Sequence, residues 1–131
     1  MKKYILEITQ EQADIISIAT DLYCRIRLGQ FNRIIDHTLE EHSDEIGIDD
    51  FLQRREETEK YLLDARTICF PELKNTFQQS YGLGHDKKCQ VAWNVHQVLR
   101  YYAGTDDRKP YAIWGELPKI KKVEVCEDSG E

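Results

Sequence analysis

The start of the chain changes from an alternating pattern to a helical one. Apolar residues occupy every second position of residues 4–8, which predicts a strand. Thr9 and Gln12 form a capping-box pair, so we expect a helix to begin there. Apolar residues follow at intervals of three and four: Ile15, Ile16, Ala19, Leu22, Tyr23 and Ile26. Gly29 either ends this helix or only kinks a longer one.

Helical spacing returns in the middle of the chain. Residues 30–42 predict a second helical piece. Residues 51–70 predict a third helix, which Asp49 or Asp50 can cap and which Pro71 should end.

The last part of the chain predicts a loop, a helix and a strand. Residues 71–88 contain two glycines and many polar groups, and long irregular segments of this kind are usually functional or disordered. A helix should follow, capped by Asp86 and ended by Gly104, and residues 119–125 alternate again. We therefore predict an α+β fold of two to four helices packed with a small antiparallel sheet. The N- and C-terminal strands form that sheet, either within one chain or across a dimer.

The last predicted helix has two contrasting sides. Its apolar positions are Val91, Ala92, Val95, Val98, Leu99 and Tyr102. Its other side carries Trp93, Asn94, His96, Gln97, Arg100 and Tyr101. We expect the apolar stripe to fasten the helix to the core. On the other side, a narrower stripe should face a pocket: Asn94, Gln97, Arg100 and Tyr101. Trp93 and His96 would then pack against a neighbouring element or a partner chain.

Composition restricts the partners. The chain has 131 residues, which fits one domain over 1–131, with residues from about 126 onward as an acidic tail. Its net charge of -6 disfavours DNA, RNA and anionic membranes. No apolar run is long enough to span a membrane, and the N-terminus lacks the pattern of a signal peptide, so we expect a cytosolic protein. The small size favours self-association.

The four cysteines show no paired motif. Cys24, Cys69, Cys89 and Cys126 are widely spaced and form no CxxC. In the cytosol such residues are expected to be free thiols, so we predict packing cysteines rather than a disulfide framework.

Enzyme and metal signatures are weak. His37 and His42 are five residues apart, which does not put two imidazoles on one helix face as a metal site would need. No G-x-S-x-G motif occurs, and Cys89 with His85 or His96 lacks a flanking signature. We therefore predict no catalytic residues, no metal and no cofactor.

Nucleotide-binding chemistry is better represented. The glycines of "YGLGHDKK" precede a helix N-terminus, where backbone amides can hold anions, although an ordinary glycine turn is the favoured interpretation of this pair alone. Arginines near Trp93, Tyr101 and Tyr81 suit a purine and phosphate ligand, because guanidinium groups bind phosphate oxygens and aromatic rings stack on bases. Solvated surface arginines are the alternative.

An ordered set of motifs carries a family resemblance. These are "LYCRIRLGQF", "ICFPEL", "SYGLGHD", "VAWNVHQVLRYY" and "LPKIKKVEV". In this order, over nearly the whole chain, they resemble the first Thoeris anti-defence family, small bacteriophage proteins that act as sponges for immune signals. The resemblance implies a binding protein and not an enzyme. It would capture cyclic ADP-ribose isomers made by TIR-domain proteins in the host bacterial cytoplasm, and some members of the family also hold cyclic oligonucleotides.

The resemblance also implies an assembly and a site. It suggests an α+β fold with two long helices, in homo-oligomers such as dimers or hexamers, with pockets between protomers. Together with the helix stripe, it gives these ligand-binding residues: Arg25, Tyr81, His85, Asn94, Gln97, Arg100, Tyr101 and Arg108. Arg27 departs from the family pattern, which puts ligand selectivity in doubt.

An alternative is an interaction protein. Trp, Tyr and Arg are also enriched where one protein binds another. The same helical aromatic face would then bind a host protein.

Overall fold

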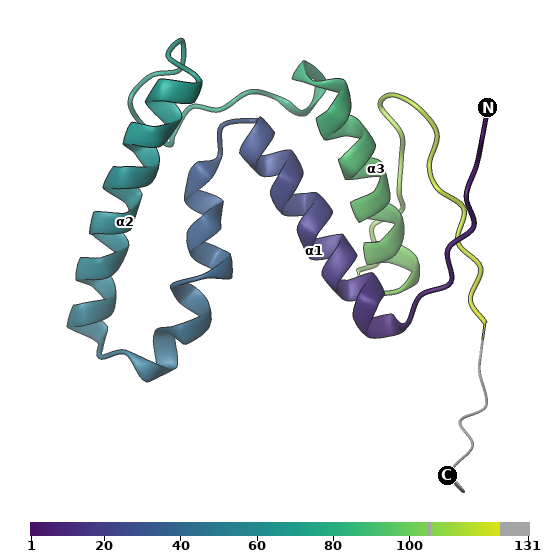
Figure 1. Ribbon diagram of the computed structural model, residues 1–131, viewed down its shortest axis with the longest axis horizontal. Helices are drawn as coiled ribbons and strands as arrows, with labels where there is room; N and C mark the ends of the chain where they lie inside the picture. The colour runs from purple at the N-terminus through teal and green to yellow at the C-terminus, as the bar shows by residue number, and fades with distance from the viewer. Residues whose placement is uncertain (105, 124–131) are drawn as a thin grey trace, which may run out of the picture.

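In the computed structural model, which describes residues 1–104 and 106–123, helices are the only regular secondary structure of the described residues. Three α-helices and three short 3-10 helices follow one another: α1 (Gln10–Arg27), η1 (Phe31–His37), η2 (Glu40–Glu45), α2 (Ile48–Cys69), η3 (Leu83–His85) and α3 (Lys87–Tyr102). Helices α1 and α3 run antiparallel and pack together, while α2 stands apart with η1 and η2 between it and α1 (Figure 1).

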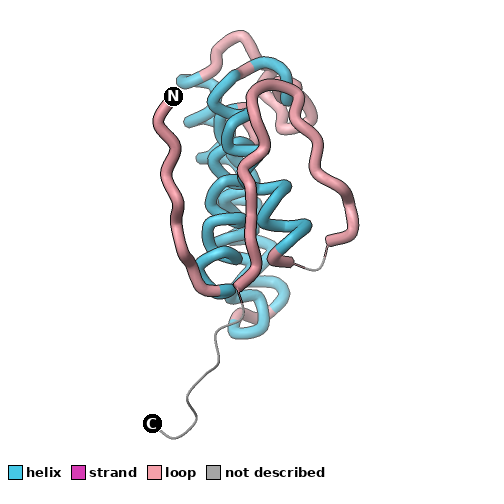
Figure 2. Tube along the Cα trace, turned by 90° about the vertical axis from the view of Figure 1, so that its right-hand side faces the viewer, coloured by secondary structure: helices cyan, strands magenta, loops and turns pink. Residues whose placement is uncertain are grey.

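The predicted α+β fold is wrong. Residues 1–8 and 116–123 are extended, but neither forms a strand, and Figure 2 draws both as loops. One ion pair joins these segments, between Lys3 and Glu116, with Nζ and Oε1 3.3 Å apart. A strand needs the backbone of a neighbouring strand, and side-chain contacts of this kind do not provide one. The last predicted strand residues, 124 and 125, and the tail from 126 lie outside the described residues.

Several helix boundaries are where the sequence predicts them. The backbone N–H of Gln12 donates to Oγ1 of Thr9 at 3.1 Å, and that of Thr9 donates to Oε1 of Gln12 at 2.9 Å, which confirms the capping box. Asp86 caps α3 by accepting from the backbone of Lys88 at 2.9 Å. Gly29 ends α1 with a φ of +86°, a conformation that residues with a Cβ rarely adopt.

Two boundaries differ from the prediction. Helix α2 begins at Ile48, so Asp49 and Asp50 lie in its first turn and Gly47 is the residue that precedes it. There the carboxylates still favour the helix through its dipole. Residues 31–45 form 3-10 turns and not an α-helix.

The core lies between α1 and α3. The fully buried members of its main cluster are Cys24, Leu28, Cys89 and Ala92, with Tyr81, Leu83 and Trp93 packed against them. Cys24 and Cys89 form a disulfide, with Cα atoms 4.4 Å apart, so the prediction of free thiols is wrong for these two. The antiparallel packing of α1 on α3 brings them together across 65 residues. Cys69 is free, as predicted, but it is exposed and not a packing residue, whereas Cys126 lies outside the described residues.

A buried arginine organises the long loop before α3. The side chain of Arg66, on α2, is 1% exposed and donates to four backbone carbonyls. Three of these belong to the loop, at Lys74, Thr76 and Gln79, and the fourth is that of Gly29. Burial lowers the pKa of this guanidinium, and carbonyl dipoles stabilise its charge in place of a carboxylate.

Candidate functional site

Trp93 lies at the centre of a cationic cluster between α1 and α3. The guanidinium carbon of Arg25, on α1, is 5.6 Å from the Trp93 ring centroid. That of Arg100, about two turns after Trp93 on α3, is 5.5 Å from the same centroid. The His96 ring is 4.9 Å from the same indole. These distances allow attraction between each cation and the electron-rich ring. Two predicted site residues, Arg25 and Arg100, therefore converge on one aromatic side chain.

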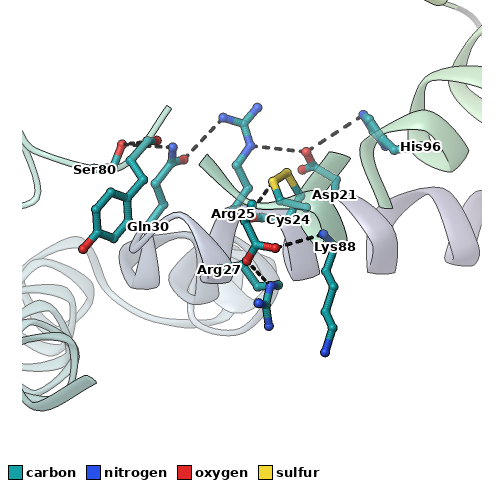
Figure 3. Close-up of a disulfide and its surroundings, with 11 residues drawn as sticks. Asp21, Cys24, Arg25, Arg27, Gln30, Ser80, Lys88 and His96 are labelled. Carbon is teal, nitrogen blue, oxygen red and sulfur yellow. Dashed lines mark hydrogen bonds and ion pairs between the residues drawn. A yellow bond between two sulfur atoms is a disulfide. The ribbon is translucent and has the colours of Figure 1, made fainter. Parts of the chain in front are cut away.

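Arg25 is held by polar neighbours along one line. Its Nε lies 3.3 Å from Oδ1 of Asp21, and its Nη1 donates to Oε1 of Gln30 at 3.3 Å. Gln30 in turn donates to Oγ of Ser80 at 3.3 Å. Figure 3 shows this row running from Ser80 to His96 above the disulfide. The row links α1 to the loop and fixes the orientation of the guanidinium.

Arg100 and Arg108 share the carboxylate of Asp106. Oδ2 of Asp106 is 3.2 Å from Nε of Arg100 and 2.7 Å from Nη2 of Arg108. Hydrogen bonds from Arg108, with the positive charge of Arg100, hold the pKa of Asp106 far below its ordinary value. The segment that carries Arg108 thus folds back onto α3.

Asn94 and Gln97 are buried, and the prediction that the apolar stripe alone faces the core is wrong. Val91 and Tyr102 of that stripe are 48% and 57% exposed, whereas Asn94 and Gln97 are 3% and 1% exposed. Residues 106–117, which we term the strap, cover this face of α3. Because the strap is extended, it presents backbone N–H and C=O groups, and side-chain amides match these better than apolar groups do.

The amides bind the strap backbone directly. Gln97 donates to the carbonyl of Tyr111 at 2.7 Å and accepts from its N–H at 3.1 Å. Asn94 donates to the carbonyl of Trp114 at 2.8 Å. Both amide groups are therefore engaged within the chain and hold the strap in place.

The other predicted residues lie in two further places. Tyr81 and His85 stack with ring centroids 3.9 Å apart, in the loop beside the core cluster. Tyr81 is anchored there because its N–H donates to the carbonyl of Leu28 at 2.9 Å. Tyr101 contacts the ring of Tyr102 edge-on at 4.7 Å. In the described structure, the Trp93 ring contacts Arg25, His96 and Arg100, and not Tyr81, His85 or Tyr101.

A serine, a histidine and an aspartate meet at the same interface without forming a catalytic triad. Nδ1 of His96 is 3.1 Å from Oγ of Ser17 but 2.8 Å from the carbonyl oxygen of Ser17, and Nε2 is 3.9 Å from Asp21. A carbonyl can only accept, so Nδ1 carries the proton and cannot take one from the hydroxyl. This contact positions α1 on α3.

Hollows in the surface lie away from these residues. One, of about 550 Å³, is between α2 and residues 75–78, and another, of about 660 Å³, is between residues 37–46 and Arg54 of α2. Neither is lined by any of the predicted ligand-binding residues. Among the described residues, no group of three histidine, cysteine, aspartate or glutamate side chains is placed to hold a metal ion.

Sequence reasoning missed the acidic partners and the buried arginine. Asp21 could have been found, because it precedes Arg25 by four residues on one helix. Asp106 and Arg66 act through contacts that only the folded chain creates.

No family model, curated protein or solved structure matches the chain. No helix in the described part of the chain is long and apolar enough to cross a membrane.

Proposed function

We propose that this protein is a phage anti-defence sponge, which binds cyclic ADP-ribose-type signals in the host bacterial cytoplasm and does not cleave them. The observation that carries the proposal is the convergence of Arg25 and Arg100 on Trp93. Guanidinium groups suit a diphosphate, and an indole suits an adenine ring. The motif resemblance supplies the class of ligand.

Capture by this site requires an exchange of partners. The carboxylates of Asp21 and Asp106 neutralise the arginines in the free chain. A diphosphate would replace these carboxylates, while the amides of Asn94 and Gln97 remain on the strap. This assigns the arginines and Trp93 to the ligand and the two amides to support of the site.

Self-association would complete the pocket. The single chain leaves many large apolar side chains exposed on its helices, among them Ile15 and Ile18 of α1 and Ile68 of α2. A homo-oligomer would bury such surface and enclose a ligand over the cluster. We propose a dimer or a larger ring, such as a hexamer.

A second candidate is a protein that binds a host protein. The same exposed apolar side chains favour it, since patches of this kind commonly mark interaction sites. In that case the cationic cluster would only join α1 to α3.

Capture and release separate the candidates. The pure protein is mixed with the signal made by an activated TIR-domain protein, the free signal is assayed, and the mixture is then heat-denatured and assayed again. A sponge depletes the signal and returns it intact; degraded signal means an enzyme, and no depletion favours the interaction protein.

Matched variants assign the site. Arg100→Ala should abolish capture with unchanged far-UV circular dichroism, whereas Arg54→Ala, at an exposed position of α2, should leave capture intact. If both variants capture the signal equally, the cluster around Trp93 is not the site.

A further inference from the structure

Asp106 carries one negative charge between two guanidinium groups. The side chains of Asp106 and Arg100 are 17% and 16% exposed, whereas that of Arg108 is 70% exposed. Arg108 reaches both carboxylate oxygens, with Nε 3.1 Å from each and Nη2 2.7 Å from Oδ2. The carboxylate thus occupies the position in which a fork of two arginines would hold a phosphate.

Two guanidinium groups contact one carboxylate at this point. Arg100 and Arg108 both reach Asp106, while Arg25 on the other helix is paired with Asp21. Nε of Arg100 is buried and, although 3.2 Å from Oδ2 of Asp106, makes no directed hydrogen bond. One donor of the cluster is therefore left without a well-placed acceptor, which a larger anion could supply.

We propose that Asp106 is an internal anion that competes with the ligand, so that the cluster selects anions with two or more negative charges, such as a diphosphate. This rests on the proposed function and deepens it. A singly charged group that displaces Asp106 exchanges one charge for another and gains little. A diphosphate brings more charge than the carboxylate it displaces, and it can reach both guanidinium groups.

The displacement needs only a local movement. The backbone N–H of Arg108 donates to Oδ1 of Asp106 at 2.8 Å, so the carboxylate is held by its own turn as well as by the arginines. The strap beyond it stays on α3 through the bonds from Gln97 and Asn94. Rotation of one side chain therefore opens the arginine pair, and the fold is kept.

The test compares two variants that remove the same charge at neighbouring positions. Asp106→Asn removes the competing anion, and Asp107→Asn, at an exposed residue next to it, is the control for net charge. Calorimetric titration with pyrophosphate and with acetate, which carries a single charge, measures binding by both variants and by the unmodified protein. We expect Asp106→Asn to bind pyrophosphate about tenfold more tightly, Asp107→Asn to change less than about twofold, and the preference for pyrophosphate over acetate to shrink only in Asp106→Asn.

Equal affinities in the two variants overturn the proposal. Hydrogen exchange over residues 106–117 shows whether Asp106→Asn releases the strap. If the strap is released and pyrophosphate binds more weakly, Asp106 is a positioning residue and the proposal is wrong.

The readouts also separate this proposal from the sponge function. If the protein captures the signal but Asp106→Asn does not bind pyrophosphate more tightly, only the role of Asp106 as a competing anion is rejected. If Asp106→Asn binds pyrophosphate more tightly but the protein does not capture the signal, only the sponge function is rejected.

Discussion

Each half of the molecule holds an irregular segment against a helix, but the chemistry differs. On α2, Arg66 holds the loop before α3 through backbone carbonyls, and its charge has no carboxylate partner among the described residues. On α3, Gln97 and Asn94 hold the strap, and Arg100 adds an ion pair with Asp106.

The difference indicates where a ligand can bind. A guanidinium bonded to four carbonyls cannot accept an anion unless the loop comes apart, because those carbonyls would then be buried without donors. A guanidinium paired with a carboxylate can exchange that partner for another anion. This favours the α1–α3 half for binding, even though both hollows described above border α2.

The largest effect should come from Arg66→Met. It keeps a long apolar stem but removes every donor to the loop, so we expect the free energy of unfolding to fall by about 3–5 kcal/mol. Urea denaturation measures it. Arg54→Met is the control on the same helix, because its side chain is 56% exposed, and it should change stability by less than about 0.5 kcal/mol. Similar losses in both variants would show that the loop does not depend on Arg66.

Reduction should have the next largest effect, on the α1–α3 half. Opening the disulfide between Cys24 and Cys89 frees a long loop in the unfolded chain, so we expect a loss of about 2–4 kcal/mol. Chemical denaturation with and without a thiol reductant measures the loss. Cys69→Ser, at an exposed thiol, should respond to the reductant as the unmodified protein does. A reductant without effect would mean that the crosslink adds nothing to the packing of the two helices.

The amides of α3 offer a smaller and sharper comparison. Gln97→Leu removes both bonds to Tyr111, so we expect a loss of about 1–2 kcal/mol and faster hydrogen exchange at the Tyr111 amide. Gln90 lies on the same helix and is also buried, but its Oε1 has no hydrogen-bond partner. Gln90→Leu should therefore be neutral or stabilising. Equal losses at both positions would contradict the role of Gln97 in holding the strap.

The smallest expected effect is on how the stability of the fold depends on pH. The pKa of Asp106 is lower in the folded chain than its ordinary value of 3.8, so its stabilising contribution is complete above that value. The contribution is lost as the pH falls from about 4 toward the much lower pKa of the folded chain, because the unfolded chain binds the proton first. Thermal unfolding followed from neutral to acidic pH should therefore decline less steeply in Asp106→Asn than in Asp107→Asn. Parallel curves would show that Asp106 makes no net electrostatic contribution.

Local signals in the sequence predicted the helices well. The capping box at Thr9, the cap at Asp86 and the left-handed Gly29 each depend on residues within a few positions, so the sequence contains what is needed. The alternation at the two ends was misleading, because a strand also requires a neighbouring backbone. Residues 1–8 and 116–123 have the pattern without that neighbour.

The candidate site was predicted only in part. Three arginines were predicted as ligand-binding residues: the structure brings Arg25 and Arg100 to Trp93, and it brings Arg108 to the carboxylate that Arg100 also contacts. Asn94 and Gln97 were assigned to a ligand because they share a helical stripe with Arg100 and match the family motif, but the backbone of the strap already satisfies them. The helix periodicity identified their shared face correctly and could not identify what would cover it.

The sequence by itself determined where α1 begins and ends and where α3 begins, because capping, glycine conformation and apolar spacing act over one or two turns. Only the tertiary structure decided which face of α3 is buried, how Cys24 meets Cys89, and which carboxylate each arginine finds. These outcomes depend on segments far apart in the chain. An amide, a thiol or a guanidinium is stable in several environments, and the partner that reaches it selects one.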